Sequence, residues 1–237
     1  MELNTKNTVM NTNVKLMQKI LFFLSLSFAL CTTCACSDSD EAEIVEVYQV
    51  PIGNGNYLIG PHEAVELGLS VKWSACYIGA KTPQDCGNYY SWGEIETKTD
   101  FSWDTYKWLD PDAPKFLKYQ NRSSVLFPED DIATVQWGKG WRMPTKEEVE
   151  ELVTLCKLTP KIDSVRNELV GLEVTGPSGK SIFLPSTGYY WVSEKVETSV
   201  PFFWTATGGD EAACAFTDSW VGRMLRDCGL PVRPVAE

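Results

Sequence analysis

Histidine is almost absent from the chain, because His62 is the only one among 237 residues. Zinc is held mainly by cysteine and histidine, and no close cysteine pair lies beyond residue 36, so no zinc site is predicted. The Gly-x-Ser-x-Gly motif of many serine hydrolases is also missing. We therefore expect a protein that is not an enzyme, with no catalytic residue, no metal and no cofactor.

The chain also lacks a hydrophobic run long enough to cross a membrane. Its N-terminal run ILFFLSLSFAL, from Ile20 to Leu30, has eleven residues, whereas a spanning helix needs about 20. Lys15 and Lys19 precede this run, which is the pattern of a secretory signal. We predict a signal peptide over residues 1–35. Met10 and Met17 are alternative starts, because MQKILFFLSLSFAL is already complete as a signal.

Three cysteines follow the apolar run. Bacterial lipoprotein signals place small residues before the cysteine that receives the lipid, and Cys36 fits best because Ala35 precedes it. The two earlier cysteines follow larger residues. We predict lipidation at Cys36, which would hold a soluble domain at a membrane without spanning it. Ordinary cleavage without a lipid is the alternative.

Positive charge is scarce as well. The net charge is −11, and residues 1–35 carry three lysines against one glutamate, so the remainder is near −13. No run rich in lysine or arginine interrupts this excess of acid. Nucleic acids and anionic lipids need positive patches, so both are disfavoured as partners.

The five cysteines beyond residue 36 suggest an oxidising compartment. Because the number is odd, at least one stays free or pairs between chains. Cys76 and Cys86 flank a turn-rich loop, and Cys214 and Cys228 flank an expected hairpin, so these are the two candidate disulfides. Cys156 lies on the apolar side of an expected helix and is interpreted as a buried thiol.

The chain is divided into the signal, an acidic linker over residues 36–60, and one domain over residues 61–237. The domain begins where mixed strand and helix patterns begin. The clearest helix starts at Thr145, because Thr145 and Glu148 form a capping box and apolar residues follow at helical spacing. The acidic segment Pro128 to Ala133 suits either a helix start or calcium ligands.

Several motifs occur in one order along the chain: GLSVKWSACYIGA, YYSWGE, EDDIATVQWGKGWRMPT, VTGPSGKSIFLPSTGY, FFWTAT and GLPVRPV. This series, from about Glu63 to Val235, resembles the Fibrobacter succinogenes major paralogous domain (FISUMP-like) family of secreted Bacteroidetes lipoproteins. The resemblance implies an α+β, C-type-lectin-like single domain with short twisted antiparallel strands, one or two helices and long ordered loops. It also implies a cell-surface binding module at the outer membrane.

The chain departs from that family at two places. Cys86 stands where the pattern usually has tyrosine, and Cys228 stands where an aromatic residue is common. The calcium-binding signatures of sugar-binding C-type lectins are absent. The resemblance therefore does not bring calcium-lectin chemistry with it.

Three groups of residues are candidate sites. Trp137, Trp141 and Arg142 suit a sugar-binding face or, as we favour, a packing corner. Glu94 and Glu96 would be the acid–base pair of a hydrolase, the least favoured function.

The main candidate is the segment Thr217 to Asp227, expected to be an exposed C-terminal loop. Tryptophan and arginine are enriched in binding hot spots. The ligand-binding residues predicted there are Trp220, Arg223, Met224, Arg226 and Asp227. The ligand would be a glycan or a protein.

A structural or accessory subunit of a surface assembly is the alternative function. In that case the segment Ile44 to Val50, IVEVYQV, would pair with the sheet edge of a partner.

Overall fold

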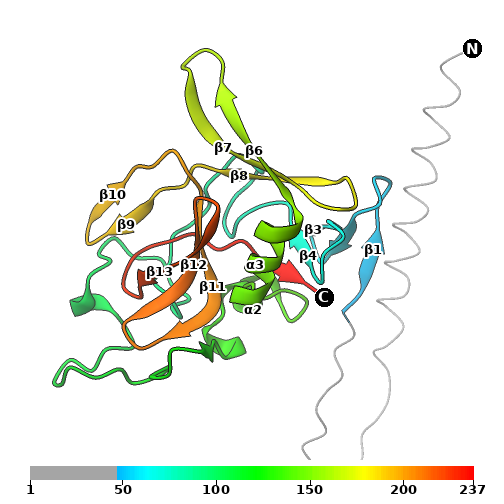
Figure 1. Cartoon of the computed structure of the whole chain (residues 1–237). Coiled ribbons are helices and arrows are strands. Elements are labelled where there is room, and N and C mark those ends of the chain that lie inside the picture. Colours follow the sequence, from blue (N-terminus) through cyan, green and yellow to red (C-terminus); the bar gives the residue numbers. More distant parts are fainter. Residues whose placement is uncertain (1–46) are drawn as a thin grey trace, which may run out of the picture. The chain divides into compact units, whose positions relative to one another are not determined.

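The computed structural model describes residues 47–237. This part of the chain forms small antiparallel sheets and contains two α-helices (Figure 1). The expected antiparallel strands and one or two helices are confirmed at this level. The predicted signal peptide and Cys36 lie outside the described residues.

A five-stranded sheet joins the two ends of the described chain. Its order is β1-β2-β3-β4-β14, with β14 paired antiparallel to β4 through Val235 and Trp73. The strands are β1 (Gln49–Pro51), β2 (Tyr57–Ile59), β3 (His62–Val65), β4 (Lys72–Ser74) and β14 (Val235–Ala236). Because β1 and β2 already belong to this sheet, the folded unit begins before residue 60, and the expected linker boundary is too late.

A four-stranded sheet forms the centre of the fold. Its order is β13-β12-β11-β5, with a register shift in β11 between Trp204 and Gly208. Side chains alternate between the two faces of a strand, so this sheet separates two apolar clusters. The strands are β5 (Ser124–Val125), β11 (Phe202–Gly209), β12 (Ala212–Thr217) and β13 (Trp220–Leu225).

The remaining strands form two smaller sheets. One is a three-stranded sheet in the order β6-β7-β8, and Figure 1 shows its β6–β7 hairpin reaching away from the other strands. The other is the β9–β10 hairpin. The strands are β6 (Lys157–Asp163), β7 (Glu168–Thr175), β8 (Ser181–Pro185), β9 (Tyr189–Trp191) and β10 (Glu194–Val196).

The helices are short and have defined starts. Asp131 caps α2 (Ile132–Trp137), and Thr145 caps α3 (Lys146–Leu155) with both bonds of the predicted capping box. The Glu148 amide donates to Thr145 Oγ1 at 3.3 Å, and the Thr145 amide donates to Glu148 Oε2 at 2.8 Å. Two 3-10 turns, η1 (Trp103–Thr105) and η2 (Pro128–Asp130), complete the helical elements. Residues 47–237 contain no helix with the length and apolarity to cross a bilayer.

Tryptophan side chains fill much of the core. On one face of the central sheet, Trp92 and Trp204 pack with Tyr90, Ile78, Ala213 and Ala215. On the other face, Trp73, Phe203 and Phe216 pack with the apolar side of α3. Burial of a large aromatic ring contributes several kcal/mol at about 25 cal/mol per Å². These rings therefore supply much of the apolar burial that stabilises the fold.

Candidate functional site

The C-terminal segment Thr217 to Asp227 is a strand and its turn, which corrects the expectation of a loop. Strand β13 pairs along its whole length with β12, placing Arg223 opposite Cys214 and Met224 opposite Ala213. Because neighbouring side chains of a strand point to opposite faces, Trp220 and Met224 lie on one face and Arg223 on the other. Met224 packs against the core cluster of Trp92 and Trp204. The five predicted residues therefore do not form one surface.

Arg226 is fully buried, which contradicts its assignment as an exposed ligand-binding residue. Its guanidinium carbon lies 4.6 Å from the centre of the Phe116 ring and 4.9 Å from that of Trp92. It donates to the Tyr106 hydroxyl at 2.7 Å and to the Asp210 carbonyl at 2.9 Å. Burial lowers the pKa of Arg226, and the nearby Tyr106 opposes this shift. The side chain holds loops together and does not reach solvent.

Asp227 is also buried, so the expectation of exposure is wrong for this residue too. Burial raises the pKa of its carboxyl to about 6, although the nearby Lys98 lowers it in part. Its Oδ1 has no hydrogen-bond partner among the described residues. Its backbone carbonyl accepts from Ser91 Oγ at 2.7 Å. Asp227 is therefore a poorly solvated acid within the fold.

Trp220 remains exposed, with 60% of its surface accessible. A Cβ placed on Gly222 would lie 3.3 Å from Cη2 of Trp220 and 2.7 Å from Oγ1 of Thr217. The indole thus extends along β13 over Gly222, in space that a side chain would occupy. This arrangement supports one part of the ring and leaves much of it open to solvent.

Arg223 lines a polar hollow of about 420 Å³ on the opposite face of β13. Its guanidinium donates to the backbone carbonyls of Gly209, at 3.1 Å, and Ala212. The other cations of this hollow have acidic partners, with Arg122 at 3.1 Å from Asp210 and Lys146 at 3.2 Å from Glu150. The hollow therefore presents little unpaired positive charge to an anion.

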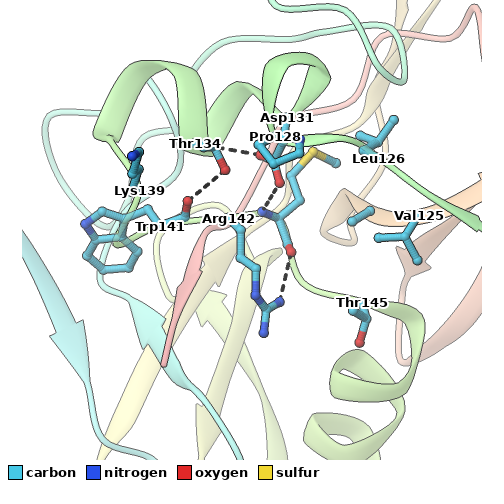
Figure 2. A pocket seen from close by; sticks show the side chains of 11 residues that line it. Val125, Leu126, Pro128, Asp131, Thr134, Lys139, Trp141, Arg142 and Thr145 are labelled. Carbon is cyan, nitrogen blue, oxygen red and sulfur yellow. Dashed lines mark hydrogen bonds between the residues drawn. The ribbon is translucent and has the colours of Figure 1, made fainter. Parts of the chain in front are cut away.

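The Trp141–Arg142 region surrounds a cleft of about 410 Å³, drawn in Figure 2. Arg142 Nη2 lies 2.6 Å from Glu148 and 2.8 Å from Glu237, and the Trp141 indole donates to the Ile59 carbonyl at 3.1 Å. The paired carboxylates raise the pKa of Arg142.

Asp131 accepts from the amides of Ala133 and Met143, which lie at 2.9 and 2.8 Å. Figure 2 shows the hydrogen bond that the Thr134 hydroxyl donates to the Trp141 carbonyl. Asp131, Thr134 and Arg142 are thus engaged with other groups of the protein. The packing-corner interpretation explains these contacts, with Trp137 stacked on His62 at 3.7 Å.

The acidic groups singled out in the sequence have structural partners. Glu94 is buried, lies 3.0 Å from Lys98 Nζ and accepts from the Lys107 amide at 2.8 Å, whereas Glu96 is exposed. Asp130 accepts from the Tyr119 hydroxyl at 2.5 Å. With Asp131 as the cap of α2, the helix-start interpretation of residues 128–133 is confirmed. Residues 47–237 contain no group of three potential metal ligands.

All five cysteines of the described chain are free thiols, so neither expected disulfide is present in the structure. Cys86 Sγ lies 3.6 Å from the Ser186 carbonyl oxygen. Burial raises the pKa of Cys76, and the positive charge of Arg233 opposes this shift. Cys214 is on the α3 face of the central sheet, whereas Cys228 belongs to the cluster on the other face. Burial raises the pKa of Cys228 to about 12, so this thiol stays protonated.

An aromatic hollow of about 450 Å³ was not predicted from the sequence. Three aromatic residues, Tyr89, Phe101 and Tyr190, line it together with Lys98 and small polar residues. These residues come from three separate segments, which explains why no local motif indicates the site. The one available signal was the aromatic triplet Tyr189 to Trp191 in a short strand that follows a glycine.

We compared the chain with family models, with curated proteins and with solved structures, and none of the three comparisons gave a match.

Proposed function

We propose that this protein is a cell-surface binding module for a glycan or a protein ligand. In this proposal Cys36 carries the lipid anchor at the outer membrane and the folded unit has a C-type-lectin-like fold. Short antiparallel sheets, two helices and a long ordered connection between β4 and β5 are consistent with that fold. The ends of the folded unit also meet, because Gln49 Nε2 donates to the Glu237 carbonyl at 2.8 Å.

The exposed indole of Trp220 is the observation that carries the proposal. Exposing a large aromatic ring forgoes roughly 25 cal/mol for each Å² left in water, and four other tryptophans of this chain are fully buried. Trp220 instead lies open over Gly222 at the end of a paired strand. A ring held in a fixed place loses little conformational entropy on binding, which favours tryptophan as an anchor.

An array of immobilised glycans and one of immobilised secreted proteins test this function. We expect at least one ligand whose binding falls about tenfold or more in Trp220→Ala, equivalent to about 1.4 kcal/mol. Val165→Ala, at the tip of the β6–β7 hairpin, is the control, because it removes another highly exposed apolar side chain. Equal binding by both variants and the original protein would contradict the proposal.

A role as an accessory subunit of a surface assembly is the second candidate. Strand β1 is the last strand of the five-stranded sheet among the described residues, and Gln49 to Pro51 are exposed. Such an edge can pair with a strand from another chain. This role predicts a stoichiometric partner that co-purifies with the protein and is lost when residues 44–50 are deleted. The melting temperature of the deleted form shows whether the rest remains folded.

A further inference from the structure

The aromatic hollow lies between the β9–β10 hairpin and the chain around Lys98. The Tyr190 ring contacts both other aromatic walls, with its centre 4.9 Å from that of Tyr89 and 5.2 Å from that of Phe101. The Phe101 and Tyr190 planes are inclined by only 27°, whereas Tyr89 meets Tyr190 edge-on at 79°. The volume of about 450 Å³ falls within the roughly 300–1,000 Å³ of small-ligand sites.

The walls of this hollow are fixed by backbone contacts. Tyr190 exchanges two hydrogen bonds with Gly229, of 2.8 and 2.9 Å, and the Phe101 amide donates to the Val192 carbonyl at 2.8 Å. A Cβ on Gly229 would lie 2.5 Å from the Phe101 ring, so the glycine makes room for this wall. The Tyr89 hydroxyl donates to the Thr187 carbonyl at 2.5 Å. Preformed walls reduce the entropy lost on binding.

The rim carries hydroxyl groups that the fold does not use. The side chains of Thr97, Thr99 and Ser193 are exposed and make no hydrogen bond to another described residue. The Tyr190 hydroxyl, on a half-buried residue, also makes no hydrogen bond to another described residue. Asn88 adds an exposed amide that makes one long bond of 3.4 Å to Tyr90. Each hydroxyl can donate and accept, so the rim matches a ligand that carries hydroxyls of its own.

The charges beside the hollow are already paired. Lys98 Nζ lies 3.0 Å from Glu94, and Lys195 Nζ lies 3.1 Å from Glu197. An anionic ligand would have to compete with these carboxylates, so the site favours a neutral one. A ligand with an apolar face and a hydroxylated edge fits aromatic walls and a hydroxyl rim together, and a sugar ring has this form.

We propose that this hollow binds one ring of a neutral carbohydrate. The apolar face of the sugar lies against Tyr190, and its hydroxyls bond to Thr97, Thr99 and Ser193. This inference rests on the proposed function as a binding module, but it names a site separate from Trp220. Lys98 forms part of the wall of the hollow, and its charge is paired with that of Glu94.

The test uses isothermal titration of the folded protein with neutral saccharides: glucose, galactose, mannose, N-acetylglucosamine, lactose and cellobiose. Sialic acid serves as the charged comparison. We expect at least one neutral saccharide to bind and sialic acid to bind about tenfold more weakly or not at all. Ser193→Trp fills the hollow from its exposed rim without removing a wall, and we expect it to reduce affinity at least tenfold. Tyr190→Ala should do the same, whereas Tyr190→Phe keeps the ring and should cost less.

Val165→Trp, which places the same large side chain at the exposed tip of the β6–β7 hairpin, is the matched control and should leave saccharide affinity unchanged. Saccharide binding that survives Ser193→Trp overturns the proposed location, and tighter binding of sialic acid overturns the preference for a neutral ligand. If no saccharide binds while the Trp220-dependent ligand of the arrays still does, the carbohydrate inference fails and the proposed function stands. If neither binds, both fail.

Discussion

A single buried guanidinium, that of Arg226, joins three segments at the end of β13. It donates to the backbone carbonyls of Tyr119 and Asp210 and to the hydroxyl of Tyr106, and it lies against four aromatic rings. Without it, the Asp210 carbonyl loses this hydrogen bond, the Tyr119 carbonyl keeps only the bond from the Asp210 amide, and the Tyr106 hydroxyl keeps only its bond to the Trp92 carbonyl.

Arg226→Ala is therefore expected to lower the free energy of unfolding by about 3–5 kcal/mol, measured by urea unfolding. Arg226→Lys should recover little of this loss, because one ammonium group cannot reach the same set of acceptors. Arg223→Ala, on the strand that precedes Arg226 but exposed, is the control and should change stability by less than about 1 kcal/mol. Similar losses for Arg223 and Arg226 would contradict the structural role of Arg226.

Asp227 makes stability depend on pH in a defined direction. Burial raises the pKa of its carboxyl from 3.8 to about 6 in the folded protein. Between these values the folded state holds a proton that the unfolded state has lost, so the contribution to stability is full below about pH 4. It falls as pH rises through about 6, where the buried carboxylate becomes charged.

The comparison with Asp227→Asn isolates this effect from other titrating groups. We expect the unfolding free energy of the original protein, relative to that of Asp227→Asn, to fall by about 1 kcal/mol or more between pH 5 and pH 8. Urea unfolding of both proteins at the two pH values measures this difference. A constant difference across the range would show that Asp227 does not titrate in the folded protein as the structure implies.

At the scale of elements, strand β13 shows what the sequence could and could not predict. Residue types alone led to the expectation of an exposed loop, because arginine and aspartate are usually at the surface. Arg226 and Asp227 are buried because rings and carbonyls from distant segments surround them, and these partners have no local signal. The Thr145 helix start was predictable because both partners of its capping box lie within four residues.

Gly222→Ala tests the support that β13 gives to Trp220. The new Cβ would lie 2.7 Å from Thr217 Oγ1 and 3.3 Å from the indole, so the ring must move. We expect ligand binding that depends on Trp220 to weaken several-fold, and stability to fall by about 1–3 kcal/mol. The array ligand and thermal unfolding provide the two measurements. Val221→Ala, which points to the opposite face, should affect stability without changing this binding.

At the scale of the whole molecule, the sequence predicted the class of fold but not the strand pairing that closes it. Short strands and two helices followed from local patterns, whereas the pairing of β14 with β4 links residues more than 160 positions apart. The start of the folded unit was placed too late because β1 and β2 are only three residues each. Neither expected disulfide is present in the structure; Cys214 and Cys228 lie on opposite sides of the central sheet, which linear spacing does not reveal.

Deleting residues 235–237 tests this closure. Val235 and Ala236 are almost fully buried, and Val235 exchanges two backbone hydrogen bonds with Arg142, of 3.1 and 2.9 Å. Their loss should lower the free energy of unfolding by at least about 3 kcal/mol, from apolar burial and unpaired backbone groups. Tryptophan fluorescence during urea unfolding follows the change, because Trp73 lies opposite Val235.

Glu237→Gln separates closure of the sheet from the surface ion pair. This variant keeps β14 and removes only the charge that lies 2.8 Å from Arg142. Because the Glu237 side chain is largely exposed, the cost should stay below about 1 kcal/mol. If the deletion costs no more than this substitution, the paired C-terminal strand does not stabilise the fold, and the five-stranded sheet is not what holds the two ends of the domain together.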